Sequence, residues 1–109
     1  MMRSYRKPLV IAAPKIGLKH PKAVSEVADF APSTHFKPTM ARDFGPQDVR
    51  RVILCSGKIA FDIEDALSKK EGLGHGVRVV RLEELAPFPV NDLRSAVGSL
   101  DKETKVTWV

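Results

Sequence analysis

Apolar and polar positions occur in blocks along the chain, and these blocks predict its strands. Three short, mainly apolar runs are typical of strands buried on both faces of a parallel sheet: Leu9–Ala13, Val49–Cys55 and Val77–Leu82. A fourth run, Lys105–Val109, alternates and places Val106 and Trp108 on one side. Helical patterns lie between these runs. The order predicts an α/β domain with three layers and a mostly parallel sheet.

The helical patterns differ in strength. The clearest covers Lys58–Lys70, where apolar residues share one helical face: Ile59, Ile63, Ala66 and Leu67. Acidic residues in its first half and lysines in its last turn suit the helix dipole. A later helix carries one apolar stripe, formed by Val90, Leu93, Val97 and Leu100. Lys15–Phe30 contains weaker helical patches, which Pro21 divides.

The stretch 31–47 predicts a long connection. It holds three prolines and few periodic apolar residues, and only a short extended piece is expected, at Phe36. Irregular loops of this length are uncommon inside compact domains unless they are functional or covered by other structure. The sequence therefore predicts that neighbouring structure packs on this segment.

Composition narrows the class of protein. The 109 residues, 43% of them hydrophobic, match one domain with one core. Cys55 is the only cysteine, which excludes an internal disulfide and a multi-cysteine metal site. No apolar run approaches the roughly 20 residues of a membrane span, and we expect no targeting segment, because Pro8 and Pro14 interrupt the N-terminal run. The net charge is +5, but the cations are scattered and the aromatic residues do not interleave with them, so we expect no nucleic-acid partner.

Candidate chemistry in the sequence is sparse. Gly72–Gly76 follows a helix and precedes a strand, the reverse of a dinucleotide-binding fingerprint. The three histidines lie far apart in the sequence and lack partners at metal-ligand spacing, and Cys55 falls in an apolar strand, where a thiol stays protonated. Ser56-Gly57-Lys58 does lie between a strand and a helix, where anions bind, but it lacks the spacing of a P-loop. A tight turn with a solvated lysine is the favoured interpretation.

Five strings occur in the order and spacing of a known family: RKPLV, APK, LKHPKAVS, RVILCSGK and RLEELAPFP. With them the chain resembles, from Arg6 to Trp108, the C-terminal domain of the decarboxylating components of 2-oxo acid dehydrogenases. The similarity is to the thiamine-diphosphate-dependent 2-oxoglutarate and 2-oxoadipate dehydrogenase branch. The string LCSGK and the alanine-rich first strand lean toward the 2-oxoadipate type of eukaryotes.

This resemblance implies a transketolase-like C-terminal fold, which is Rossmann-like. It implies part of an oxidoreductase of the tricarboxylic acid cycle or of lysine degradation, which decarboxylates a 2-oxo acid and passes the acyl group to lipoyl. In the family, thiamine diphosphate and magnesium are held by upstream domains through a Gly-Asp-Gly motif, which this chain lacks, so we expect the segment alone to bind neither and to be inactive. The implied partners are the rest of the dehydrogenase chain, a homodimer partner and the lipoyl acyltransferase component. The implied compartment is the mitochondrial matrix in a eukaryote and the cytoplasm otherwise.

The resemblance also bears on completeness and on ligand sites. The family pattern continues past the tryptophan strand, so residues 1–109 are expected to form a single, incomplete domain cut at both ends. The alternative is a stand-alone, non-catalytic α/β module that binds an anionic ligand or a protein partner. Relatives use this domain in dimer contacts and, in some bacteria, in an effector nucleotide site, with Arg6, Lys7, Lys15 and Lys58 as the matching basic positions. Arg6 and Lys7 are expected at the sheet edge opposite Lys58, and theirs is the favoured effector or interface side.

Overall fold

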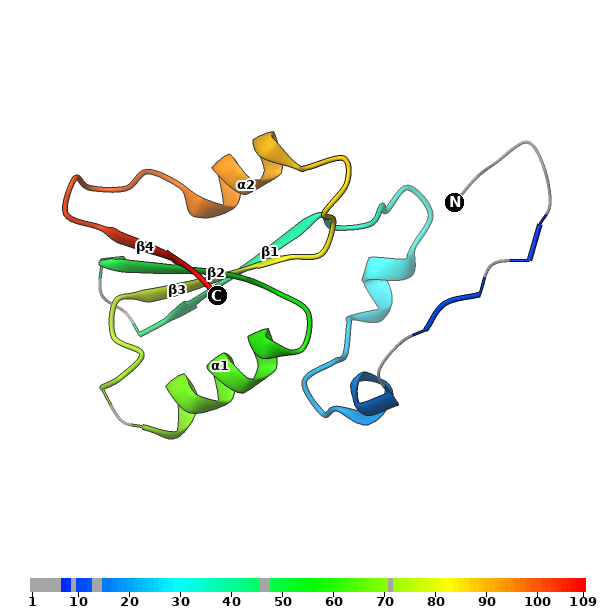
Figure 1. Cartoon of the computed structure of the whole chain (residues 1–109), viewed down its shortest axis with the longest axis horizontal. Helices are drawn as coiled ribbons and strands as arrows, with labels where there is room; N and C mark the ends of the chain where they lie inside the picture. Colours follow the sequence, from blue (N-terminus) through cyan, green and yellow to red (C-terminus); the bar gives the residue numbers. More distant parts are fainter. Residues whose placement is uncertain (1–6, 9, 13–14, 46–47, 71) are drawn as a thin grey trace.

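The computed structural model describes residues 7–8, 10–12, 15–45, 48–70 and 72–109. Within these residues the chain begins with two short 3-10 helices, η1 (Lys15–Lys19) and η2 (Val27–Phe30), and continues into an α/β body (Figure 1). In chain order the body consists of β1 (Thr39–Phe44), β2 (Arg51–Ser56), α1 (Ile59–Lys69), β3 (Val77–Leu82), α2 (Val90–Val97) and β4 (Lys105–Trp108).

The strands form one sheet in the order β1-β3-β2-β4. β2 is parallel to both β3 and β4, whereas β1 pairs antiparallel with β3. α1 packs on β2 and β3, and α2 packs on β1 and β3; Figure 1 shows the two helices on opposite faces of the sheet. The predicted α/β architecture with three layers and a mostly parallel sheet is therefore confirmed.

The core lies on both faces of the two central strands. On the α1 face, Cys55, Val77 and Val79 are buried together with Ala60 of the helix. On the other face, Val80 and Leu82 are buried next to Val52. Such apolar runs, buried on both faces, are typical of parallel strands covered by helices. No helix among the described residues is long and apolar enough to cross a membrane.

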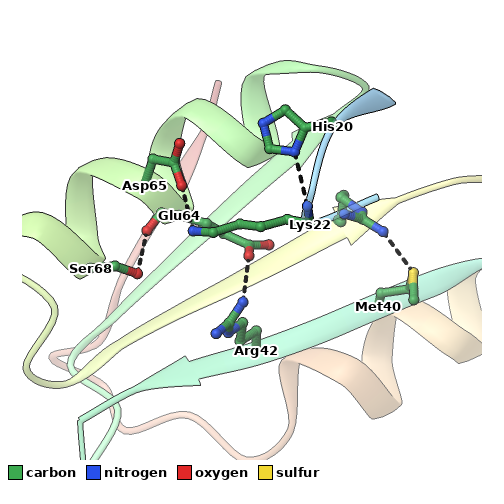
Figure 2. A network of polar contacts seen from close by, with 8 residues as sticks. His20, Lys22, Met40, Arg42, Glu64, Asp65 and Ser68 are labelled. Atoms are coloured by element: carbon green, nitrogen blue, oxygen red, sulfur yellow. Dashed lines mark hydrogen bonds and ion pairs between the residues drawn. The ribbon is translucent and has the colours of Figure 1, made fainter. Parts of the chain in front are cut away.

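The inner face of α1 differs in part from the predicted one. Ile63 and Leu67 pack against the core as expected, but Ile59 is 39% exposed. Ala60 and Glu64 are the buried residues of this helix. Ala60 has a small side chain, which lets the helix approach the sheet closely. Glu64 is accommodated because Arg42 of β1 donates a hydrogen bond to it over 2.8 Å, which offsets the cost of burying a carboxylate (Figure 2).

The N-terminal predictions are wrong for the residues that the structure describes. Of the predicted strand Leu9–Ala13, both end residues lie outside the described residues, and residues 10–12 form no strand. Val10 is 92% exposed, because no neighbouring strand pairs with this segment and no helix covers it. The helical patches of Lys15–Phe30 form only η1 and η2. Val24 and Val27 are exposed, and without a core to receive them so short an apolar face does not support an α-helix.

The connection predicted for 31–47 contains a strand, β1, which the sequence pattern did not indicate. β1 is an edge strand whose central residues are exposed, so it lacks an apolar run. Elsewhere the predicted bounds agree closely. β3 has the predicted bounds, α1 is one residue shorter than predicted at each end, and α2 ends at Val97, before the predicted Leu100.

Arg78 ties three elements of the body together. Its guanidinium donates two hydrogen bonds, of 2.6 and 2.8 Å, to the carboxylate of Asp43 on β1. Its Nη1 donates a third, of 2.9 Å, to the carbonyl of Val97 at the end of α2. The hydrogen bonds from Arg78 lower the pKa of Asp43 below its usual value. Arg78 therefore links the edge strand, the central strand and the helix of one face.

This ion pair predicts a loss of stability in acid. A carboxyl group whose pKa is lower in the folded chain stabilises the fold above its unfolded pKa of about 3.9, and this stabilisation is lost as the pH falls through the folded value. We expect Asp43→Asn to destabilise the chain at neutral pH and to flatten the acid limb of the unfolding profile, measured by urea denaturation across pH. Asp101→Asn, at an exposed position, is the control. If the acid limb of Asp43→Asn matches that of the unsubstituted chain, the Arg78–Asp43 pair does not cause the loss of stability in acid.

Candidate functional site at the carboxyl edge of the sheet

The carboxyl ends of β2 and β3 lie side by side, with Ser56 opposite Leu82. From this edge the chain leaves β2 into α1 on one face and leaves β3 toward α2 on the other (Figure 1). In open α/β sheets, ligands bind outside the carboxyl ends of the parallel strands. Candidate ligand-binding positions are therefore Ser56-Gly57-Lys58 and the end of β3.

Residues 20–38, here called the strap, lie against this edge. The ring of His20 packs on the ring of Phe61 in α1, with centroids 4.6 Å apart and planes inclined by 31°. Lys22 extends from the strap to Asp65 of α1, with 2.5 Å between Nζ and Oδ1 (Figure 2). The His20 Nδ1 accepts a hydrogen bond of 3.2 Å from the backbone N–H of Lys22. One aromatic contact and one ion pair thus hold the strap to α1.

A cavity of about 480 Å³ lies between the strap and the body. The strap contributes His20, His35 and Phe36, and the body contributes Lys58, Phe61 and Arg81. Its volume is in the range of small-molecule sites. The strap and the carboxyl edge of the sheet therefore line one candidate binding site.

The cations around the cavity each have an acidic partner. Lys58 pairs with Asp62 at 3.0 Å, and Lys37 pairs with Asp29 at 2.6 Å. The Nε of Arg81 lies 2.5 Å from Glu83 Oε1, but the direction is not that of a hydrogen bond, so the contact is an ion pair only. The hydrogen bonds from Lys22 and Lys37 hold the pKa values of Asp65 and Asp29, respectively, below their usual range.

The basic residues predicted as effector or interface positions are not brought together. Arg6 lies outside the described residues. Lys7 and Lys15 are exposed in and just after the irregular N-terminal segment, and neither lines the cavity. Lys58 does line it, at the amino end of α1.

Arg81 was not predicted as a site residue from the sequence, and His20 and His35 were predicted to be separate loop residues. An arginine inside the apolar run of β3 was a usable signal, because a central strand does not bury a charge without a partner. The two histidines are 15 positions apart in the sequence, and only the course of the strap brings both to one cavity. His75, the third, is not among the residues lining it.

The described residues do not fit a thiamine diphosphate and magnesium site. They contain no group of three or more His, Cys, Asp or Glu side chains that could hold a metal ion. The sequence has no Gly-Asp-Gly string. Burial raises the pKa of the Cys55 thiol, the only cysteine, which makes it a poor nucleophile. We therefore derive no catalytic step from this chain.

Comparison with known proteins identifies the class to which this domain belongs. A profile of the 2-oxoglutarate dehydrogenase C-terminal family matches residues 24–109, which is most of the chain. The chain belongs to this family, and the resemblance stated from its motifs is confirmed.

Individual relatives refine the placement. The 2-oxoadipate dehydrogenase complex component E1 of Rattus norvegicus is 39% identical over 112 residues, covering 99% of this chain. The probable 2-oxoadipate dehydrogenase complex component E1 homolog of Dictyostelium discoideum and the 2-oxoglutarate dehydrogenase E1 component of Bacillus velezensis are each 36% identical, covering 100% of this chain. In all three the chain spans about 12% of the relative's length.

Proposed function

We propose that this chain acts as the C-terminal assembly domain of a 2-oxo acid dehydrogenase E1 component of the 2-oxoadipate or 2-oxoglutarate type. The observation that carries the proposal is 36–39% identity to such components over practically the whole chain. The chain corresponds to about 12% of the length of those proteins, so the proposed role is that of one domain within a longer polypeptide.

The proposed role is structural rather than catalytic. Many large apolar side chains of the N-terminal segment and of β4 are exposed, among them Val10, Leu18, Val27, Phe30 and Trp108. Large exposed apolar side chains mark surface that other protein can cover. Such surfaces support contacts with the remaining domains of the same chain and with a homodimer partner.

The proposed reaction belongs to the whole E1 component. Bound elsewhere in that component, thiamine diphosphate with magnesium would stabilise the carbanion formed when the 2-oxo acid loses carbon dioxide. The acyl group would then pass to lipoyl on the acyltransferase component of the complex. The proposed settings are lysine degradation for a 2-oxoadipate substrate and the tricarboxylic acid cycle for 2-oxoglutarate. We propose the mitochondrial matrix as the compartment in a eukaryote and the cytoplasm in a bacterium.

Immunodepletion tests this proposal in the native source. An antibody raised against residues 24–109 should remove 2-oxo acid dehydrogenase activity from an extract, because the domain and the catalytic parts are proposed to share one polypeptide. Assays with 2-oxoadipate and 2-oxoglutarate decide between the two substrates, since only one activity should fall. Antibody pre-absorbed with the chain is the control. If both activities survive complete depletion, the proposal fails.

The exposed apolar surface also predicts how the isolated chain behaves. We expect it to bind an apolar fluorescent dye and to self-associate at higher concentration, because Val106, Trp108 and Val109 lie exposed at the unpaired edge of the sheet. Light scattering after size exclusion measures the association. Val106→Lys with Trp108→Lys should reduce it, because charges on an edge strand oppose pairing. A chain that stays monomeric and binds no dye would contradict the proposal that other protein covers these apolar surfaces.

A further inference from the structure

The cavity between the strap and the body combines flat apolar walls with cations. Phe61 of the body and Phe36 of the strap both line it, and His20 packs on the ring of Phe61. Met40 of β1 adds a further apolar side chain. Flat apolar groups favour offset or edge contacts with aromatic rings. These walls therefore suit a ligand with a flat, apolar body.

Arg81 is the cation best placed to receive a charged group. Its guanidinium carbon lies 5.0 Å from the centroid of the Phe61 ring, and its side chain is 18% exposed. Its Nη2 lies 2.9 Å from the Met40 sulfur, which is only a weak acceptor. Its Nε is buried and donates no hydrogen bond, although Glu83 is close. An oxyanion would offer this planar fork two strong acceptors in matching geometry.

The ion pair of Lys58 does not block the site. Lys58 and Asp62 are one helical turn apart, and their side chains are 52% and 53% exposed. Exposed pairs of this kind contribute little to stability. A ligand anion can therefore recruit Lys58 from Asp62 without disturbing the fold.

We propose that this cavity binds a small organic anion with a flat, apolar body. The anionic group lies on Arg81 and Lys58, and the body lies against Phe36, Phe61 and His20. The site is formed by the described residues of this chain alone and does not rest on the proposed dehydrogenase assignment. A binding experiment on the chain therefore fails or succeeds independently of the immunodepletion experiment.

Nuclear magnetic resonance titration with 2-naphthoate tests the proposal on the full chain. Acetate supplies the anionic group alone and 2-naphthol supplies the flat body alone. We expect 2-naphthoate to shift the amide signals of Lys58, Phe61 and Arg81 with a millimolar dissociation constant, and each partial probe to bind about tenfold more weakly or not at all. Absence of these shifts, or equal affinity for 2-naphthol, overturns the proposal.

Substitutions locate the anionic group. Arg81→Met keeps the length of the side chain and removes the charge, and we expect about tenfold weaker binding of 2-naphthoate. Arg94→Met, at an exposed position on α2, is the matched control and should bind unchanged. If Arg81→Met perturbs the fold, Lys58→Met provides the same comparison, with a smaller expected loss. Undiminished binding in a folded Arg81→Met or in Lys58→Met overturns the assignment of the anionic group.

Discussion

Replacing Leu82 with alanine is expected to lower the free energy of unfolding by about 2–5 kcal/mol. Leu82 is 1% exposed at the end of β3 and is the largest of the fully buried side chains. Its strand is paired on both sides, by β1 and β2, so the backbone cannot move in to fill the space that the substitution leaves. The loss then includes both the transfer of apolar surface and an unfilled cavity. Urea denaturation followed by circular dichroism measures it.

Leu85 provides the matched control. It lies three residues further along the chain and is 59% exposed. Leu85→Ala removes the same atoms but little buried area, so the expected change is within about 0.5 kcal/mol. Similar losses in Leu82→Ala and Leu85→Ala would show that the buried face of β3 has been misplaced.

Gly76→Ala is the second substitution with a large expected effect, at least about 2 kcal/mol. Gly76 has a φ of +69°, and a Cβ there would lie 2.8 Å from the carbonyl oxygen of Asp48. Its own carbonyl accepts hydrogen bonds from the N–H groups of Arg50 and Arg51, at 2.8 and 3.1 Å, where the chain enters β2. The obstacle is backbone, so any movement that relieves the contact disturbs the start of two central strands.

Gly72 separates backbone strain from this steric contact. Its φ is +82°, similar to that of Gly76, but a Cβ would meet nothing within 4 Å. Gly72→Ala therefore carries the conformational cost alone, about 1 kcal/mol. We expect Gly76→Ala to unfold at a clearly lower urea concentration than Gly72→Ala. Coincident unfolding curves would contradict the close approach of Gly76 to Asp48.

The central part of the fold was predictable because its strands are buried on both faces. β2 and β3 carry nearly continuous apolar runs, and α1 follows directly after β2. β1 was not predictable, because Arg42 and Asp43 face partners on α1 and β3 rather than an apolar layer. The opposite error occurred at residues 10–12, where an apolar run forms no strand and stays exposed. The apolar pattern of a segment indicates that its side chains should be buried, but it does not identify the segment that buries them.

The candidate site was predictable only in part. The strand-to-helix turn at Lys58 was recognisable in the sequence, but a solvated lysine was the favoured interpretation and Lys58 was a candidate only through the family resemblance. Arg81 was overlooked because it sits among valines and leucines in a strand, where its neighbours dominate the pattern. The contribution of His20 depends on its contact with Phe61, 41 positions away. Long-range contacts of this kind leave no local signature.

A segment exchange tests most directly whether this chain acts as the C-terminal assembly domain of an E1 component. In the 2-oxoadipate dehydrogenase complex component E1 of Rattus norvegicus, the segment that aligns with this chain is replaced by this chain. Deletion of the same segment and a chimera carrying Gly76→Ala serve as controls. The measured quantities are dimer formation and decarboxylation of 2-oxoadipate.

We expect the chimera to assemble and to recover most of the activity that the deletion abolishes, because the exchanged domain presents the same fold and contact surfaces. The Gly76→Ala chimera should recover less, in proportion to its loss of folded domain. A chimera that contains a folded domain, yet is no more active and no more dimeric than the deletion, would contradict the proposed role.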